Sequence, residues 1–295
     1  MATIKFALTK VRVHILYVRS PQRLELCIQV RLIVRMFSCL ISSNTEVQIF
    51  AGYVLVPILP PYAFRIGLLV IVDDMTVEPE FYRMAPPNVA IHSARMMYDP
   101  TFISRESLAK LEFQIEKAVE EVLWTRPNVI CFACTSGSLV IGDKRIVEKI
   151  HQKSPNVPAT TTITAVLESF RELNVRKVSI GTPYTDDVNE AEKNYLEERG
   201  VAVVEIEGLQ IREGPMLSLQ EQDTIYALAK RVDRPEAQAV FLSCTGLHAI
   251  PLIEKLEAEL KKPVISSNQA SFWHSCKLAG IRGPITGYGR LLNTL

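Results

Sequence analysis

Two apolar runs of strand length end in the same short motif, about 110 residues apart. Residues 129–138 read Val-Ile-Cys-Phe-Ala-Cys-Thr-Ser-Gly-Ser, and residues 239–248 read Ala-Val-Phe-Leu-Ser-Cys-Thr-Gly-Leu-His. Cys134 and Cys244 therefore each stand where a buried strand ends. The amides that come next can open a helix, and a helix N-terminus favours a thiolate and offers N–H groups to an oxyanion. The repeat predicts two thiols that face one ligand.

The segments around these motifs alternate between strand and helix, in the same order twice. The run from Arg65 to Val72 is continuously apolar, as is typical of a strand buried on both faces. Residues 155–165 and 261–270 also match each other. The further strands are predicted at 89–96, 128–134, 157–162, 176–181, 201–206, 239–244 and 263–266. The helices are predicted at 104–124, 144–152, 165–173, 185–199, 219–231, after Cys244 through Glu259, and at 270–278.

This alternation predicts an α/β fold with two pseudo-symmetric lobes, each a mostly parallel sheet flanked by helices. We place the first lobe at residues 64–176 and the second at 177–295, and we expect the C-terminal helix to pack back on the first lobe. In open α/β sheets, ligands bind beyond the carboxyl ends of the strands. Both cysteine motifs lie at such ends, so we expect the active site in the cleft between the lobes.

The composition is that of an ordinary globular protein. Apolar residues make up 48% of the chain, charged residues 22%, and the net charge is +1. This balance favours neither nucleic acid nor stable membrane association, and no apolar run reaches the ~18–20 residues that a membrane span needs. Six cysteines in 295 residues do not form a disulfide framework pattern, so we expect a cytoplasmic location. We interpret the four remaining cysteines as small buried residues: Cys27, Cys39, Cys131 and Cys276.

Residues 1–63 differ from the rest of the chain. Residues 1–62 contain seven Lys or Arg and two acids, whereas the remainder contains 26 basic and 30 acidic residues. The segment shows no clear periodicity, and we expect it to be poorly structured. Three interpretations stay open: an upstream translation artefact, a targeting or surface-binding arm, and a genuine added element. We favour the artefact because the composition of this segment is foreign to that of the lobes.

Four motifs carry a resemblance to a known family. The chain from about residue 64 to 290 resembles the aspartate/glutamate racemase superfamily, and within it the branch of maleate cis-trans isomerases and arylmalonate decarboxylases. The motifs are Cys-Thr-Ser-Gly-Ser at 134–138, Gly-Thr-Pro-Tyr-Thr-Asp at 181–186, Leu-Ser-Cys-Thr-Gly at 242–246 and Pro-Val-Ile-Ser-Ser-Asn-Gln-Ala-Ser-Phe-Trp at 263–273.

The resemblance implies a role for each cysteine. Cys134 matches the first-lobe cysteine of the isomerases, where the decarboxylases have glycine, and Cys244 matches the second-lobe cysteine. Because this chain has both, the resemblance favours isomerase or racemase chemistry over simple decarboxylation. It also implies a homo-oligomer, a small carboxylic or dicarboxylic acid as substrate, and no metal or other cofactor.

The resemblance further implies a set of substrate-binding residues. Thr135, Ser136 and Tyr184 match positions that hold a substrate carboxylate, and Thr245 and Gly246 follow the second cysteine.

Two implied positions depart from the isomerases. Asp74 stands where they usually have asparagine, and the segment 208–213 lacks a second asparagine of theirs. An amide can donate to a carboxylate, whereas an ionised aspartate only accepts. A simple dicarboxylate is therefore in doubt: the far end of the substrate is an amine, amide or hydroxyl, or Arg212 supplies a replacement cation.

Several mechanisms suit two thiols. In racemisation one thiolate removes an α-proton and the opposite thiol delivers one. In isomerisation one thiolate adds to an alkene, the central bond rotates and the thiolate is expelled. Both build negative charge on a carboxylate, which hydrogen-bond donors stabilise. An arylmalonate-type decarboxylase, a non-enzymatic carboxylate sensor, and cysteines that are merely buried strand ends are the alternatives.

Overall fold

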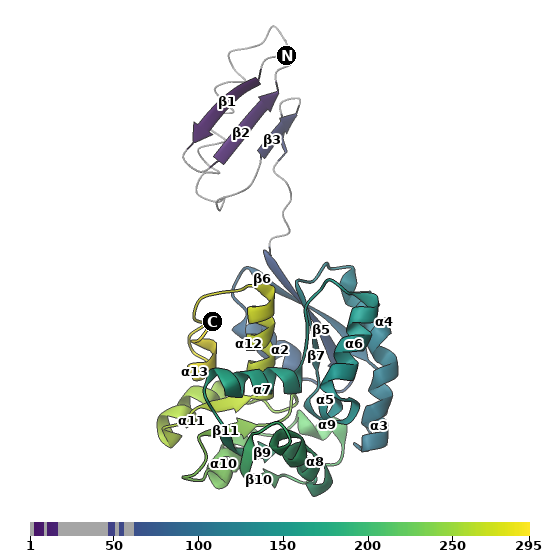
Figure 1. The fold of residues 1–295 in the computed structure, drawn as a ribbon, viewed down its shortest axis with the longest axis vertical. Helices are drawn as coiled ribbons and strands as arrows, with labels where there is room; N and C mark the ends of the chain where they lie inside the picture. Colours follow the sequence, from purple (N-terminus) through teal and green to yellow (C-terminus); the bar gives the residue numbers. More distant parts are fainter. Residues whose placement is uncertain (1–2, 9–10, 17–46, 51–52, 56–61) are drawn as a thin grey trace. The chain divides into compact units, whose positions relative to one another are not determined.

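The computed structural model of the chain (Figure 1) describes residues 3–8, 11–16, 47–50, 53–55 and 62–295. The chain divides into two compact units, Met1–Pro61 and Tyr62–Leu295. The described part of the first unit is a four-stranded sheet in the order β1 (Thr3–Leu8), β2 (Val11–Leu16), β3 (Val47–Phe50), β4 (Tyr53–Leu55). Most of residues 1–63, with Cys27 and Cys39, lies outside the described residues, so the interpretations of that segment stay predictions.

The second unit contains two four-stranded parallel sheets, and the strands have the same order in both. The first sheet runs β6 (Val89–Met96), β5 (Phe64–Ile71), β7 (Val129–Ala133), β8 (Ala159–Thr161). The second runs β10 (Ala202–Gly208), β9 (Lys177–Thr182), β11 (Ala239–Leu242), β12 (Val264–Ser266). In each sheet the lobe's first strand lies between its second and third strands, with all neighbours parallel. The predicted α/β fold with two similar lobes is confirmed.

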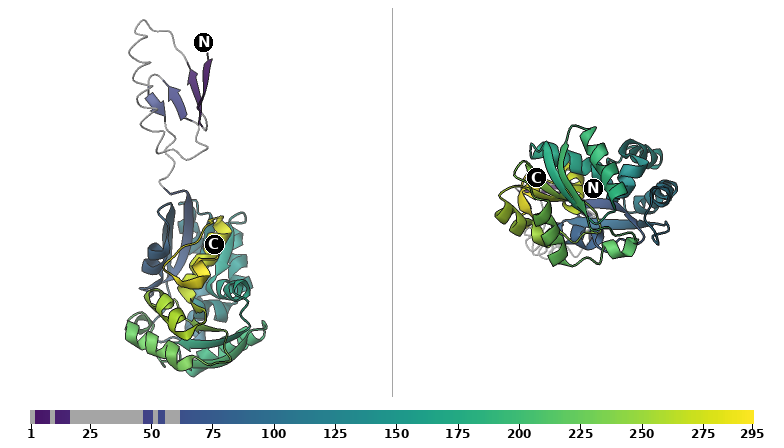
Figure 2. Two further views of the ribbon diagram at one scale, coloured as in Figure 1. Left: turned by 90° about the vertical axis from the view of Figure 1, so that its left-hand side faces the viewer. Right: turned by 90° about the horizontal axis from the view of Figure 1, so that it is seen from below.

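Helices pack on both sheets (Figures 1 and 2). Those of the first lobe are α2 (Val77–Met84), α3 (Arg105–Ala109), η1 (Lys110–Gln114), α4 (Ile115–Leu123), α5 (Thr135–Ile141), α6 (Asp143–Lys153) and α7 (Thr162–Glu172). Those of the second are α8 (Asp186–Glu197), α9 (Gly214–Leu217), α10 (Gln222–Val232), η2 (Ile250–Leu252), α11 (Ile253–Leu260), α12 (Ser267–Ala279) and α13 (Gly289–Leu292). The 3-10 turn η1 divides the helix predicted over 104–124. Helix α12 packs on α7, β7 and α2 of the first lobe.

Each lobe has a glycine in its first strand where a helix approaches closely. A Cβ at Gly67 of β5 would lie 3.2 Å from Val122 of α4, and a Cβ at Gly181 of β9 would lie 2.9 Å from Leu228 of α10. A glycine inside a strand often marks such an approach. The repeat therefore extends from the order of the elements to the way the helices cover the sheets.

The helices that follow the fourth strand of each lobe begin with a side-chain cap. The Thr161 side chain accepts from the Thr164 N–H at the start of α7. Ser266 and Gln269 form a capping box at the start of α12, in which Ser266 Oγ accepts from Gln269 N at 3.1 Å. Helix α12 ends at Gly280, whose φ of 79° suits a residue without a Cβ.

The described part of the chain contains no helix that is both long and apolar enough to cross a membrane.

We predict that Ser266→Ala lowers the free energy of unfolding by about 1 kcal/mol, because the Gln269 N–H loses its acceptor. Urea unfolding followed by circular dichroism measures this. Ser93→Ala, at an exposed position of β6, is the control and should change stability little. Equal losses in the two variants would show that the cap contributes nothing specific.

Candidate active site

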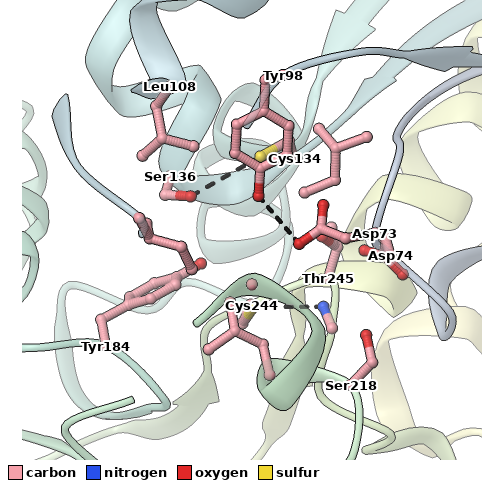
Figure 3. A pocket seen from close by; sticks show the side chains of 15 residues that line it. Asp73, Asp74, Tyr98, Leu108, Cys134, Ser136, Tyr184, Ser218, Cys244 and Thr245 are labelled. Atoms are coloured by element: carbon pink, nitrogen blue, oxygen red, sulfur yellow. Dashed lines mark hydrogen bonds between the residues drawn. The ribbon is translucent and has the colours of Figure 1, made fainter. Parts of the chain in front are cut away.

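The two cysteines line one pocket (Figure 3). It lies at the carboxyl ends of strands of both sheets, where an open α/β sheet binds its ligands. About 330 Å³ of space, open solvent at the mouth included, is available in it. The lining residues come from the end of β5 and the loop after it, from the start of α5, from the loops after β9 and β11, from residues 98–108, and from the segment around α9: Ile71, Asp73, Asp74, Tyr98, Ile103, Leu108, Cys134, Ser136, Tyr184, Gly214, Leu217, Ser218, Cys244, Thr245 and Gly246.

Cys134 is the N-cap residue of α5. Its backbone is extended, with φ −158°, and its Sγ accepts from the Gly137 N–H at 3.3 Å. The hydroxyl of Ser136 lies 3.8 Å from the same sulfur. A Cβ at position 137 would lie 3.0 Å from the sulfur, so a glycine there leaves the thiol room against the helix.

The sulfur of Cys244 accepts a similar hydrogen bond, but the backbone after Cys244 has a different conformation from that after Cys134. The Gly246 N–H donates to its Sγ at 3.2 Å. The helix that we predicted directly after Cys244 is absent: residues 245–249 form turns, and the first helical residue is Ile250 in η2. Pro251 has no N–H to extend a helix backwards, and a Cβ at Gly246 would lie 3.1 Å from Leu217 of α9. Only Cys134 therefore has a helix N-terminus.

Burial dominates the acidity of both thiols. Cys134 and Cys244 are 2% and 4% exposed. Burial raises the pKa of Cys134 to about 12, although the Gly137 N–H and Ser136 act in the opposite direction. Burial also raises the pKa of Cys244, against the effect of the Tyr184 hydroxyl. The helix N-terminus that we expected to favour a thiolate is outweighed in the ligand-free pocket.

Thr135 is the one predicted site residue that does not line the pocket. Its Oγ1 donates to Ser267 Oγ at 2.9 Å, and the Cys244 N–H donates to the same Ser267 Oγ at 3.1 Å. Ser267 is the fully buried first residue of α12. It joins the two cysteine loops, and sequence reasoning missed it although it lies in the quoted motif at 263–273.

Ser136, Tyr184, Thr245 and Gly246 all reach the pocket from the positions predicted for them. Tyr184 follows β9, the first strand of its lobe, and its side chain is buried beside Cys244 (Figure 3). Its N–H donates to Thr182 Oγ1 at 3.0 Å, which fixes the turn after the strand.

Three further polar residues line the pocket without having been predicted: Asp73, Tyr98 and Ser218. The Tyr98 hydroxyl donates to Asp73 Oδ2 at 3.0 Å. A Cβ at Gly214 would overlap Asp73 Oδ2, so a larger residue there would displace the Asp73 carboxylate. Asp73 could have been suspected from its place beside Asp74, whereas no motif pointed to Tyr98.

Asp74 uses only one of its carboxylate oxygens within the described part of the chain. Oδ1 accepts from the N–H groups of Thr76 at 2.8 Å and Val77 at 2.9 Å, at the start of α2. Oδ2 is buried without a hydrogen-bond partner among the described residues. Burial raises the pKa of Asp74, although the Val77 N–H, the Thr245 side chain and the Thr76 N–H act against it. From outside, the Arg95 guanidinium donates to the carbonyl of Asp74 at 2.9 Å.

A family model supplies the decisive comparison. The model described as arylmalonate decarboxylase matches residues 66–292. The chain belongs to the arylmalonate decarboxylase family. This confirms the resemblance to the branch of isomerases and decarboxylases.

Two curated proteins and one solved structure are similar to this family member. The maleate isomerase of Nocardia farcinica is 27% identical over 77% of this chain and 95% of its own length. The arylmalonate decarboxylase of Bordetella bronchiseptica is 34% identical, over 48% of this chain and 60% of its own length. The solved structure is a cysteine-to-serine mutant of the Nocardia farcinica maleate cis-trans isomerase with a covalently bound succinylcysteine intermediate. It is 26% identical, with a TM-score of 0.72, and the match covers 78% of this chain and 98% of that one.

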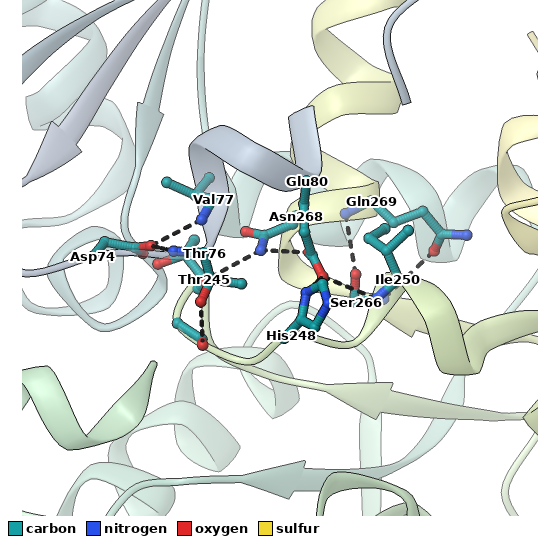
Figure 4. A network of polar contacts seen from close by, with 11 residues as sticks. Asp74, Thr76, Val77, Glu80, Thr245, His248, Ile250, Ser266, Asn268 and Gln269 are labelled. Atoms are coloured by element: carbon teal, nitrogen blue, oxygen red, sulfur yellow. Dashed lines mark hydrogen bonds and ion pairs between the residues drawn. The ribbon is translucent and has the colours of Figure 1, made fainter. Parts of the chain in front are cut away.

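A buried carboxylate ties the loop after Cys244 to the first lobe (Figure 4). Glu80 of α2 is fully buried, and its Oε1 accepts from His248 Nδ1 and from the Ile250 N–H, each at 3.0 Å. Its Oε2 accepts from Asn268 Nδ2 at 2.7 Å, and the same amide donates to the Thr245 carbonyl at 2.8 Å. His248 is therefore part of a structural network.

Among the residues that the structure describes, no group of three or more His, Cys, Asp or Glu side chains is arranged to hold a metal ion. Cys131 and Cys276 are buried outside the pocket, as predicted for them.

We predict that Glu80→Gln lowers both stability and turnover. The side-chain N–H₂ of glutamine would face the N–H₂ of Asn268, and two donors cannot bond each other. Rotating the Asn268 amide by 180° would supply an acceptor, but its N–H₂ would then lose the hydrogen bond to the Thr245 carbonyl. Loss of one buried hydrogen bond should cost about 1–3 kcal/mol. Urea unfolding and kcat/KM measure the two effects. Glu120→Gln, on the exposed face of α4, is the matched control, and a wild-type profile for Glu80→Gln would contradict the role of the network.

We predict that the alkylation rate of Cys134 in the ligand-free protein rises about tenfold per pH unit from pH 7 to 10. The reactive thiolate stays a minor species over this range because burial raises the pKa of Cys134 to about 12. Peptide mass spectrometry after timed treatment with iodoacetamide gives the rate at this residue. A model thiol should level off near its pKa of ~8.5. A plateau for Cys134 below pH 9 would show that the pocket stabilises the thiolate instead.

Proposed function

We propose that the chain is a cofactor-independent isomerase that uses Cys134 and Cys244 to convert the cis form of a small unsaturated carboxylic acid into the trans form. The observation that carries this proposal is that two thiols, one from each lobe, line a single buried pocket. Binding alone does not need two such thiols. The similarity to maleate isomerases over most of the chain supports the same reaction type.

The reaction needs one carbon–sulfur bond that forms and then breaks. A thiolate adds to one alkene carbon, and the electron pair of the double bond moves onto the carboxylate as an enediolate. The central bond is now single and rotates. The enediolate pair then re-forms the double bond in the trans geometry and expels the thiolate, so no atom is gained or lost.

Donors around the pocket suit the charge that this reaction builds. The hydroxyls of Ser136 and Tyr184 lie beside the cysteines and can donate to the enediolate oxygens. Because the pocket is buried, such donors act with less screening by solvent than they would at the surface. Cys134, as the thiolate, is the group that adds, since it alone has the N-terminus of a helix behind it. Cys244 gives its proton to the α-carbon of the adduct and takes one back from that carbon before the carbon–sulfur bond breaks, so the proton count is unchanged.

The racemase and decarboxylase alternatives use the same pocket. A racemase would exchange the α-proton of an amino acid between the two thiols. A decarboxylase would release CO₂ with Cys244 and tolerate glycine at position 134. A sensor would bind a carboxylate without turnover. A homo-oligomeric state and a cytoplasmic location stay predictions.

We predict that Cys134→Ser and Cys244→Ser each lower turnover of cis-alkene carboxylates by about 10³-fold or more. Proton NMR in D₂O follows the alkene signals and also reports deuterium at Cα from amino acids. In Cys244→Ser, intact-mass spectrometry should find a covalent adduct, which peptide mapping places on Cys134. Cys276→Ala, a buried thiol outside the pocket, is the control. Turnover that survives both serine variants would contradict the proposal.

A further inference from the structure

The end of the pocket formed by the loop after β5 offers two acceptors and no cation. Asp73 Oδ1 and Asp74 Oδ2 are buried and have no hydrogen-bond partner among the described residues. Asp74 as a whole is 4% exposed. Buried acceptors are costly to leave unpaired, and the cost falls when a ligand supplies a donor.

The rest of the pocket wall does not neutralise these acids. None of the lining residues in the described part of the chain is Lys, Arg or His. Arg212, the cation that the sequence suggested, is exposed and does not line the pocket, and its carbonyl accepts from the Ile103 N–H. Tyr98 already donates to the other oxygen of Asp73. A second carboxylate on the substrate would meet two acids, and the cation near them, Arg95, lies outside the pocket, where it is paired with Glu78 and the Asp74 carbonyl.

The direction of the Asp74 side chain is fixed by the backbone. Because the Thr76 and Val77 N–H groups hold Oδ1, Oδ2 is the oxygen left for the pocket. An asparagine in the same pose would keep its carbonyl oxygen on those N–H groups and place an N–H₂ donor where Oδ2 lies. With the carboxyl of Asp74 ionised, the identity of this one residue therefore decides whether that end of the pocket accepts or donates hydrogen bonds.

We propose that Asp73 and Asp74 select a substrate with a carboxylate at one end and an N–H donor, a primary amide or an ammonium group, at the other. This inference rests on the proposed isomerase function and names the substrate class of the same site. The carboxylate faces the thiols and the hydroxyls of Ser136 and Tyr184, while the N–H groups donate to Asp73 Oδ1 and Asp74 Oδ2. The half-amide of maleate and cis-4-aminobut-2-enoate are the smallest cis alkenes of this kind.

Binding is tested first, with saturated analogues that cannot isomerise. Succinate, its half-amide and 4-aminobutanoate are compared as protectants of Cys134 against iodoacetamide. In the wild type, the half-amide or the amine should protect at a concentration at least about tenfold lower than succinate. Better protection by the half-amide would identify the donor as a primary amide, and better protection by 4-aminobutanoate would identify it as an ammonium group. Equal or better protection by succinate would overturn the inference, whether or not the protein turns over any alkene.

The variants Asp74→Asn and Asp73→Asn then test the two acids. Asp74→Asn keeps the acceptor for the Thr76 and Val77 N–H groups, so the loop stays capped. Each variant should shift the preference by about tenfold or more toward succinate. Asp223→Asn, exposed in the first turn of α10, should leave the preference unchanged. An unchanged preference in both pocket variants would overturn the assignment.

Turnover separates the two proposals. With the three cis alkenes in the NMR assay, the wild type should favour the half-amide or the amine over maleate in kcat/KM, and Asp74→Asn should move that ratio toward maleate. If the wild type turned over maleate faster than the other two alkenes, and Asp74→Asn did not change the ratio of kcat/KM values, the isomerase function would be retained and the proposed substrate class would be overturned. No turnover of any alkene, with the protection pattern intact, would overturn the isomerase alone.

Discussion

The first turn of α12 holds the two cysteine loops together, and the geometry of the site depends on it. Ser267 Oγ receives hydrogen bonds from the Thr135 hydroxyl and from the Cys244 N–H, so one buried atom joins the loops that follow the third strand of each lobe. The next residue, Asn268, donates to Glu80 and to the Thr245 carbonyl. A helix from the end of the chain thus links both lobes at the point where two thiols must be aligned to share one substrate.

Burial gives this arrangement its chemical character. The same packing that fixes the thiols raises their pKa values, since a buried thiolate loses its hydration. The acids of the loop after β5 add negative charge beside them and act in the same direction. A ligand that brings N–H donors to those acids would relieve part of that repulsion. The N–H end of the proposed substrate would thus favour the thiolates, whereas its carboxylate, which faces the thiols, would act in the opposite direction.

Much of the fold could be read from the sequence because strands buried on both faces leave continuous apolar runs, as in residues 65–72 and 239–244. The duplicated Cys-Thr motif likewise placed both thiols at strand ends. Other features depend on contacts distant in sequence. Nothing local shows that the Thr135 hydroxyl is occupied by Ser267, or that Tyr98 meets Asp73. The turns after Cys244 depend on how Gly246 packs against α9, which no periodicity encodes.

The two lobes repeat each other at the thiols and differ beside them. Cys134 and Cys244 follow the third strands, which have the same place in the two sheets. After the first strands, by contrast, one lobe presents Asp73 and Asp74, and the other presents Tyr184. A substrate with identical ends gains nothing from a pocket whose ends differ in this way. A pocket with two thiols, acids after the first strand of one lobe and a tyrosine after that of the other suits a molecule whose two ends differ, which it holds in one orientation while the central bond reacts.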